Sequence, residues 1–160
     1  MKEVNPIDVS ILSSFKAVDE QKVNHLLNEE LKKLNKKIVV LDDDPTGVQT
    51  VHGVNVYTDW KKDTVKKGFD EENSMFFILT NSRGFTVPQT TQAHKEMALN
   101  IAQVSAETGK DYILLSRSDS TLRGHYPLET MTLKNEIESV SDKRFDGEII
   151  YPFFKEGGRF

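Results

Sequence analysis

The stretch IVVLDDDPTGVQTVHG, from Ile38 to Gly53, runs from a continuous apolar segment straight into three aspartates and then Pro-Thr-Gly. Apolar residues on consecutive positions are typical of a strand covered on both faces, as in a parallel sheet. Asp-Pro-Thr-Gly alone would suit a plain turn, because Asp caps amides, Pro fixes φ and Gly allows a positive φ. A turn needs only one aspartate, so three adjacent like charges indicate a site for a cation or a proton.

Similar short apolar runs recur along the chain and extend this prediction. They predict five strands, at 37–42, 53–59, 74–80, 111–116 and 148–154. The segments between these runs are long enough to form helices. This alternation predicts a doubly wound α/β fold of one domain, with a mostly parallel sheet flanked by helices in a Rossmann-like, three-layer arrangement.

Three helices are predicted from apolar spacing and capping residues. Leu and Val residues at helical spacing predict an amphipathic helix over 19–34. A capping box from Thr86 to Gln89 opens a second helix, which Gly109 closes. A third helix begins near Pro127, with a less regular apolar stripe at Leu128, Met131, Leu133, Ile137 and Val140. The charged connection 59–73 is compatible with a short helix or a solvated loop.

Composition restricts the class of protein and its partner. The 160 residues suffice for one domain, and the net charge of −4 gives no electrostatic reason to expect nucleic acid or an acidic membrane surface. The chain has no cysteine, which excludes disulfides and thiolate metal sites and fits a reducing compartment. It shows neither a signal peptide nor an apolar run of roughly 20 residues. We therefore expect a soluble, cytoplasmic protein that binds a small molecule.

Polar clusters follow four of the predicted strands, where ligands bind in open α/β sheets. The clusters are DDDPTG (42–47), TNSRGF (80–85), SRSDSTLRGHY (116–126) and KEGGRF (155–160). They contain four arginines, Arg83, Arg117, Arg123 and Arg159, whose guanidinium groups suit carboxylate or phosphate, so an anionic ligand is predicted. At least one of Asp42, Asp43 and Asp44 is expected to act as a base on a hydroxyl or to help hold Mg²⁺. The histidines lack metal-ligand spacing, and no metal ligands are assigned.

The segments LDDDPTG, TNSRG, SDSTLRG and PFFKEGGRF, in this order, resemble the N-terminal, substrate-binding half of the four-carbon acid sugar kinases. This family includes the threonate, erythronate and 3-oxo-tetronate kinases. The resemblance covers about residues 37–160, and it leaves 1–36 as an N-terminal helical leader. It implies an ATP-dependent kinase in which Asp43 or Asp44 accepts the proton of the hydroxyl being phosphorylated. The implied substrate-binding residues are Arg83, Arg117, Asp119, Ser120, Thr121, Arg123, Gly158 and Arg159.

The chain also departs from this family. Arg117 stands where many members have Lys, and His125 where many have Asn, which leaves the identity of the acid open. The family implies ATP and Mg²⁺, but no GxxxxGK[ST] phosphate loop occurs in the sequence. We therefore expect the nucleotide to bind a missing partner domain, and this chain to be inactive as a kinase alone.

Self-association of the chain is also expected. An uncovered sheet edge and the apolar residues Phe153, Phe154 and Phe160 would favour it.

Two other interpretations stay open. Asp42-x-Asp44-x-Thr46 matches the DxDx[TV] pattern of haloacid-dehalogenase-like phosphatases, with Asp42 as nucleophile, Asp44 as acid/base and Thr80 as the phosphate-binding threonine. That interpretation gives no role to SDSTLRG or EGGR. The third interpretation is a sugar-acid-binding module without catalysis, which differs from the kinase mainly in whether a partner domain exists.

Overall fold

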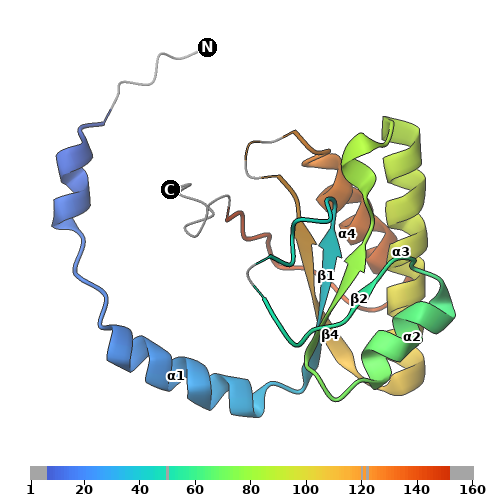
Figure 1. The fold of residues 1–160 in the computed structure, drawn as a ribbon, viewed down its shortest axis with the longest axis horizontal. Helices are drawn as coiled ribbons and strands as arrows, with labels where there is room; N and C mark the ends of the chain where they lie inside the picture. The colour runs from blue at the N-terminus through green and yellow to red at the C-terminus, as the bar shows by residue number, and fades with distance from the viewer. Residues whose placement is uncertain (1–6, 50, 120, 122, 152–160) are drawn as a thin grey trace. The chain divides into compact units, whose positions relative to one another are not determined.

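The protein was analysed as a computed structural model, which describes residues 7–49, 51–119, 121 and 123–151 (Figure 1). The chain divides into two units, residues 1–34 and 35–160. The first unit contains a 3-10 helix, η1 (Val9–Ser14), and α1 (Glu20–Lys33), which confirms the helix predicted over 19–34. The carboxylate of Asp19 caps α1 by accepting the amide of Lys22 at 3.0 Å. The apolar side chains of α1 are about half exposed.

The second unit is built on a parallel sheet. Within the described residues the sheet has four strands, β1 (Lys36–Asp42), β2 (Val56–Tyr57), β3 (Met75–Leu79) and β4 (Asp111–Arg117). Their order is β2-β3-β1-β4, and every pair is parallel. The predicted α/β fold with a parallel sheet flanked by helices is therefore confirmed. Because β1 lies between β3 and β4, the ends of these three strands are neighbours.

Two of the strand predictions need correction. The run 53–59 forms only the two-residue strand β2. The run predicted as a strand over 148–154 is not a strand in its described part, residues 148–151. Ile149 and Tyr151 are largely exposed, so burial does not stabilise an extended conformation there. Residues 152–154 lie outside the described part of the chain.

Three helices pack against one face of the sheet. They are α2 (Lys62–Asp70), α3 (Val87–Thr108) and α4 (Leu128–Val140). The capping box at Thr86 and the left-handed Gly109, with φ of 65°, confirm the predicted ends of α3. The charged connection 59–73 contains α2, because Val65 and Phe69 lie one turn apart and both are fully buried.

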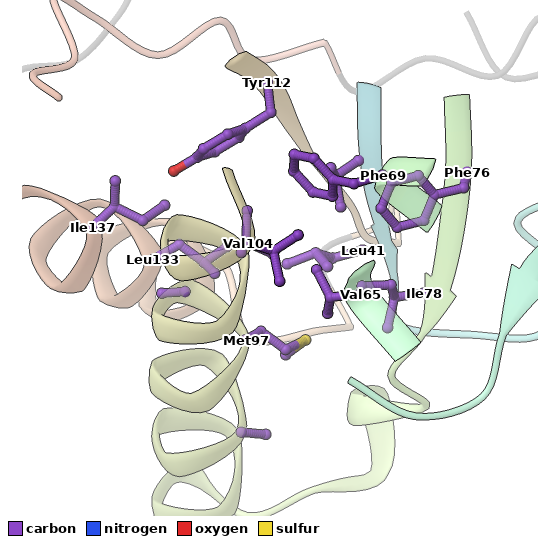
Figure 2. Close-up of a cluster of buried hydrophobic side chains, with 14 residues drawn as sticks. Leu41, Val65, Phe69, Phe76, Ile78, Met97, Val104, Tyr112, Leu133 and Ile137 are labelled. Atoms are coloured by element: carbon purple, nitrogen blue, oxygen red, sulfur yellow. The ribbon is translucent and has the colours of Figure 1, made fainter. Parts of the chain in front are cut away.

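The core lies between that face and the helices, as Figure 2 shows. Phe76 and Ile78 of β3 point into this core, and they alternate along the strand with residues whose side chains lie on the opposite face of the sheet. Leu133 and Ile137 bring α4 into the core, whereas Met131 and Val140 are exposed, so the predicted apolar stripe of this helix is only partly correct. None of the helices in the described residues is long and apolar enough to cross a membrane.

Gly68 marks a close approach between α2 and β3. A Cβ at this position would lie 2.5 Å from two ring atoms of Phe76, which is fully buried. We expect Gly68→Ala to lower the free energy of unfolding by about 1–3 kcal/mol, because the ring cannot move without disturbing the core. Ala favours a helix over Gly by about 1 kcal/mol, so a net loss of stability in Gly68→Ala would come from the clash with the Phe76 ring.

Urea denaturation of Gly68→Ala measures this loss. Gly147→Ala is the control, because a Cβ at Gly147 would meet nothing within 4 Å. Equal stability of both variants and the wild type would show that the α2–β3 contact is loosely packed.

Candidate functional site

The carboxyl ends of β1, β3 and β4 meet at one edge of the sheet, and the candidate site lies there. Asp42, at the end of β1, is paired with the last residues of both neighbouring strands. Backbone hydrogen bonds continue beyond the strands. The amide of Asp43 donates to the carbonyl of Arg117 at 3.2 Å, and the amide of Arg83 donates to the carbonyl of Asp43 at 3.3 Å. Three of the four predicted polar clusters are therefore brought together, and the fourth, 155–160, lies outside the described residues.

Arg83 joins two of the three aspartates. It lies in the short 3-10 helix η2 (Ser82–Gly84), which follows β3. Its Nε and Nη2 donate to Oδ2 and Oδ1 of Asp43 at 3.1 and 2.8 Å, and its Nη1 donates to Oδ2 of Asp44 at 2.9 Å. The hydrogen bonds from Arg83 to Asp43 raise the pKa of the guanidinium. Since the Asp43 side chain is only 3% exposed, this pair fixes the position of a buried carboxylate.

Asp44 is the most accessible of the three adjacent aspartates. Its side chain is 23% exposed. One carboxylate oxygen accepts the hydroxyl of Thr46 and, at 2.8 Å, the amide of the same residue. These bonds, the hydroxyl bond first, lower the pKa of Asp44. Asp44 is therefore an ionised carboxylate that a ligand can approach.

Asp42 is the most deeply buried of the three, and its side chain is 2% exposed. Burial raises its pKa to about 6, against an opposing effect of Arg117, whose Nη1 lies 3.3 Å from Oδ1. The charges of Asp43 and Asp44 add to the increase. A Cβ on Gly47 would lie 1.7 Å from Oδ2 of Asp42, so the turn after β1 packs directly on this carboxyl group and needs glycine there.

Asp119, Thr121 and Arg123 form a second cluster on the loop after β4. Nε of Arg123 donates to Asp119 and, at 3.0 Å, to the hydroxyl of Thr121, and this hydroxyl donates to Asp119. The bond from Arg123 is the main reason that the pKa of Asp119 is lowered. The charge of Asp119 also contributes to the raised pKa of Arg83, so the two clusters belong to one electrostatic site. The Arg123 side chain is 65% exposed and faces solvent.

The site is nearly balanced in charge. Each described arginine that the sequence assigned to it is bonded to an aspartate. The three guanidinium groups face four aspartates, and the charges of these seven groups sum to −1 when all the aspartates are ionised and to zero when Asp42 is protonated. An anionic ligand must therefore use N–H groups that the aspartates leave available. Arg117 and Arg123 are the more exposed arginines and best placed for this.

Several predicted residues contribute differently or are not described. Ser120, Gly158 and Arg159 lie outside the described residues. Thr80, the phosphate-binding residue of the phosphatase interpretation, is buried, and its hydroxyl donates to the carbonyl of Asp42 at 3.0 Å and bonds to Ser82. Among the residues that the structure describes, no three His, Cys, Asp or Glu side chains are grouped so that they could hold a metal ion.

Two side chains at the site had no role assigned from the sequence, although Ser118 lies within the predicted polar cluster 116–126. Oγ of Ser118 donates to Oδ2 of Asp43 at 3.1 Å. Glu129, in the first turn of α4, is 1% exposed, and its pKa is raised by burial and by the charge of Asp43. A signal for Glu129 was present, because it lies four and eight residues before the buried Leu133 and Ile137, on the apolar side of the helix.

Comparison with known families defines the class of protein. Residues 38–160 match the family of sugar-binding N-terminal domains, and the chain belongs to this family. The match begins in β1 and includes every loop of the candidate site. A sugar-binding domain has a small sugar molecule as its partner. No curated protein and no solved structure matches the chain.

Proposed function

We propose that this chain binds a four-carbon sugar acid and forms the substrate-binding part of an ATP-dependent sugar-acid kinase. The family match supports a sugar ligand. The observation that supports an acidic ligand is that Arg83, Arg117 and Arg123, from the ends of β3 and β4 and the segments that follow them, lie at one sheet edge. The aspartates leave N–H groups of the more exposed Arg117 and Arg123 available, and a carboxylate binds such groups by charge-assisted hydrogen bonds, which a neutral sugar cannot form as strongly.

The geometry supports different roles for the two aspartates assigned to catalysis. Asp43 is only 3% exposed and accepts hydrogen bonds from Arg83 and Ser118, so this residue anchors the site. Asp44 is the more exposed carboxylate, and a base must first come within hydrogen-bond reach of the proton that it accepts. We therefore assign to Asp44 the acceptance of the proton of the sugar hydroxyl. Arg117 and Arg123 bind the carboxylate of the ligand, and Asp119 and Thr121 hold Arg123.

ATP would supply the phosphoryl group in this proposal. The described residues do not fit a metal ion, and the sequence has no GxxxxGK[ST] phosphate loop. We therefore assign neither ATP nor Mg²⁺ to these residues, and we place their binding in a separate nucleotide-binding domain. A sugar-acid-binding module without catalysis would have the same ligand but no such partner.

A thermal-shift titration tests the ligand. The wild-type chain is titrated with threonate and with erythronate, and with the neutral polyol erythritol and ATP as controls. A ligand that binds only the folded state at 100 times its Kd adds about 2.7 kcal/mol, or roughly 5–10 °C in Tm for a chain of this size. We expect such a rise with at least one acid and not with erythritol. An equal rise with erythritol, or none with either acid, would contradict the proposal.

Arg117→Ala tests the contribution of one arginine to anion binding. We expect the affinity for the acid to fall by about 10- to 100-fold, because a charge-assisted hydrogen bond is worth about 1.5–3 kcal/mol. Calorimetric titration at pH 7 measures the affinity. Arg117→Lys is the matched control, since it keeps the charge and is the residue that many four-carbon acid sugar kinases carry there. Unchanged affinity in Arg117→Ala would remove Arg117 from the ligand site.

A further inference from the structure

The strand β4 forms an open edge of the sheet. Within the described residues it is the last strand in the order β2-β3-β1-β4, and Figure 1 shows it at one side of the sheet. The carbonyl of Arg117 accepts a hydrogen bond from the amide of Asp43, so it faces β1. Because backbone groups alternate in direction along a strand, those of Leu114 and Ser116 face away from β1. Between described residues, no hydrogen bond outside the β1–β4 ladder reaches these outward groups.

Apolar side chains at this edge are also left uncovered. Tyr112 and Leu114 of β4 pack into the core on the helix side of the sheet. Ile113 and Leu115 alternate with them and lie on the opposite face, where they are 41% and 44% exposed. Val40 of β1 lies beside Leu115 on that face but is only 3% exposed. The apolar row on this face is therefore covered as far as β1 and is open at β4.

The sequence of β4, DYILLSR, is complementary to itself when two copies run antiparallel. With Leu114 at the centre, Ile113 of one copy lies opposite Leu115 of the other, and the reverse pair lies across the two-fold axis. The backbone groups of these residues face β1, so each is a non-hydrogen-bonded pair, in which the Cα atoms are only about 4.5 Å apart. Four half-exposed apolar side chains would then be neighbours on one face.

The charges at the two ends of β4 favour the same arrangement. At the amino end Asp111 forms ion pairs with Lys36 and Lys143, and these three groups have a net charge of +1. At the carboxyl end lies Arg117, one of the seven groups of the candidate site whose charges sum to −1 when all are ionised. Antiparallel pairing places each amino end beside the carboxyl end of the other copy, so opposite charges meet twice.

We propose that two copies of this chain form a dimer in which their β4 strands pair antiparallel about Leu114, so that one sheet continues through both copies. A two-fold axis relates the copies, and each uses the same surface. The opposite edge strand, β2, has only two residues and therefore offers few backbone groups for pairing. The inference goes beyond the proposed function and does not depend on it, because the pairing needs no ligand.

The outward backbone groups of β4 supply the hydrogen bonds of this dimer. The amide and carbonyl of Leu114 bond to the same groups of Leu114 in the other copy. The amide of Ser116 donates to the carbonyl of Tyr112, which accepts Nζ of Lys143 at 3.1 Å but has a second lone pair. The amide of Tyr112 donates to the carboxylate of Asp111 at 2.8 Å, and it exchanges this partner for the carbonyl of Ser116 in the other copy.

Sedimentation equilibrium over a series of protein concentrations tests the dimer. We expect the wild-type chain to approach twice its mass of 18.2 kDa as the concentration rises. Ile113→Lys should raise the dissociation constant by more than about tenfold, because it places two charges in the apolar cluster. Val56→Lys is the matched control, since Val56 lies on the same face of the opposite edge strand and is also 41% exposed.

Ser116→Pro gives a second test, and it serves alone if Ile113→Lys does not fold. It removes an outward amide without removing a β1–β4 hydrogen bond, and an edge strand tolerates proline at such a position. We expect it to weaken the dimer as Ile113→Lys does. The proposal would be overturned by a wild-type chain that stays monomeric at every concentration. A dimer that survives both changes at β4, or that Val56→Lys weakens equally, would overturn it as well.

Disulfide trapping tests the register of the two strands. The chain has no cysteine, so Ile113→Cys and Leu115→Cys each introduce a single thiol. Position 113 of one copy faces position 115 of the other at a Cα distance that a disulfide spans. A mixture of the two variants should therefore form a covalent dimer on mild oxidation, and neither variant alone should do so. Equal trapping in a single variant, or in a mixture of Leu115→Cys with Val56→Cys, would overturn the antiparallel register.

Discussion

Replacing Arg83 by alanine is expected to lower the free energy of unfolding at pH 7 by about 3–5 kcal/mol, the usual cost of removing one partner from a buried ion pair. Arg83 makes two hydrogen bonds to Asp43 and one to Asp44, and Asp43 is almost completely buried. Without the guanidinium group of Arg83, Asp43 keeps the hydroxyl of Ser118 and a longer ion pair with Arg117 at 3.8 Å, and Asp42 and Asp44 remain beside it. Chemical denaturation at constant pH measures the loss.

Two further variants separate charge from packing. Arg83→Ala combined with Asp43→Asn should be more stable than Arg83→Ala alone, because it removes a buried charge whose remaining ion pair, with Arg117, is long. Arg123→Ala should cost much less than Arg83→Ala, since Arg123 is mainly exposed and solvent screens its pair with Asp119. If the double variant were no more stable than Arg83→Ala, the role of Arg83 would be packing rather than charge compensation.

The fold was predictable wherever burial and local signals agreed. The run KIVVLD became the central strand β1, and Thr86 and Gly109 marked both ends of α3, because capping and periodicity act over a few residues. The run EIIY has the same local composition as a strand, but its described residues are mainly exposed and form none. Strand formation depends on partners distant in sequence, and a local pattern does not contain them.

The site was predictable in its residue types and not in their pairing. The sequence indicated that aspartates and arginines gather at the strand ends, because parallel strands end at the same edge. It did not show that Arg83 pairs with Asp43 and Asp44 while Arg117 pairs with Asp42 and, at 3.8 Å, with Asp43, since these pairs depend on the order β3-β1-β4. It also left the choice between Asp43 and Asp44 as the base open, although in the structure the first is buried and the second is accessible.

Asp42→Asn is expected to change how stability depends on pH. The pKa of Asp42 is about 6 in the folded chain, above its ordinary value of 3.8. Between these two pH values the folded state holds a proton that the unfolded state has released. The free energy of unfolding therefore falls as pH rises through this window, by roughly 2–3 kcal/mol for a difference of about two pH units. An asparagine stays neutral, so the variant does not lose this stability.

The difference between the free energies of unfolding of Asp42→Asn and the wild type isolates Asp42. This difference should rise in favour of the variant between pH 4 and pH 7. Glu129, whose pKa is also raised, does not contribute to the difference, because it is present in both chains. Asp44 and Asp119 have lowered pKa values, so they act below this window. A flat difference would contradict the effect of burial on Asp42. Asp146→Asn, at an exposed aspartate outside the site, is the control variant.

The same variant links this titration to the ligand. Ionisation of Asp42 changes the summed charge of the three arginines and four aspartates at the site from zero to −1. A sugar acid stays anionic above pH 5, because a free carboxyl group has a pKa near 3.5–4. We therefore expect wild-type affinity to increase as pH falls from 7 to 5.5, and Asp42→Asn to bind about fivefold more tightly at pH 7, since one nearby like charge costs about 1 kcal/mol. Affinity that rises with pH would mean that ionised Asp42 assists binding, through Arg117 or a ligand hydroxyl.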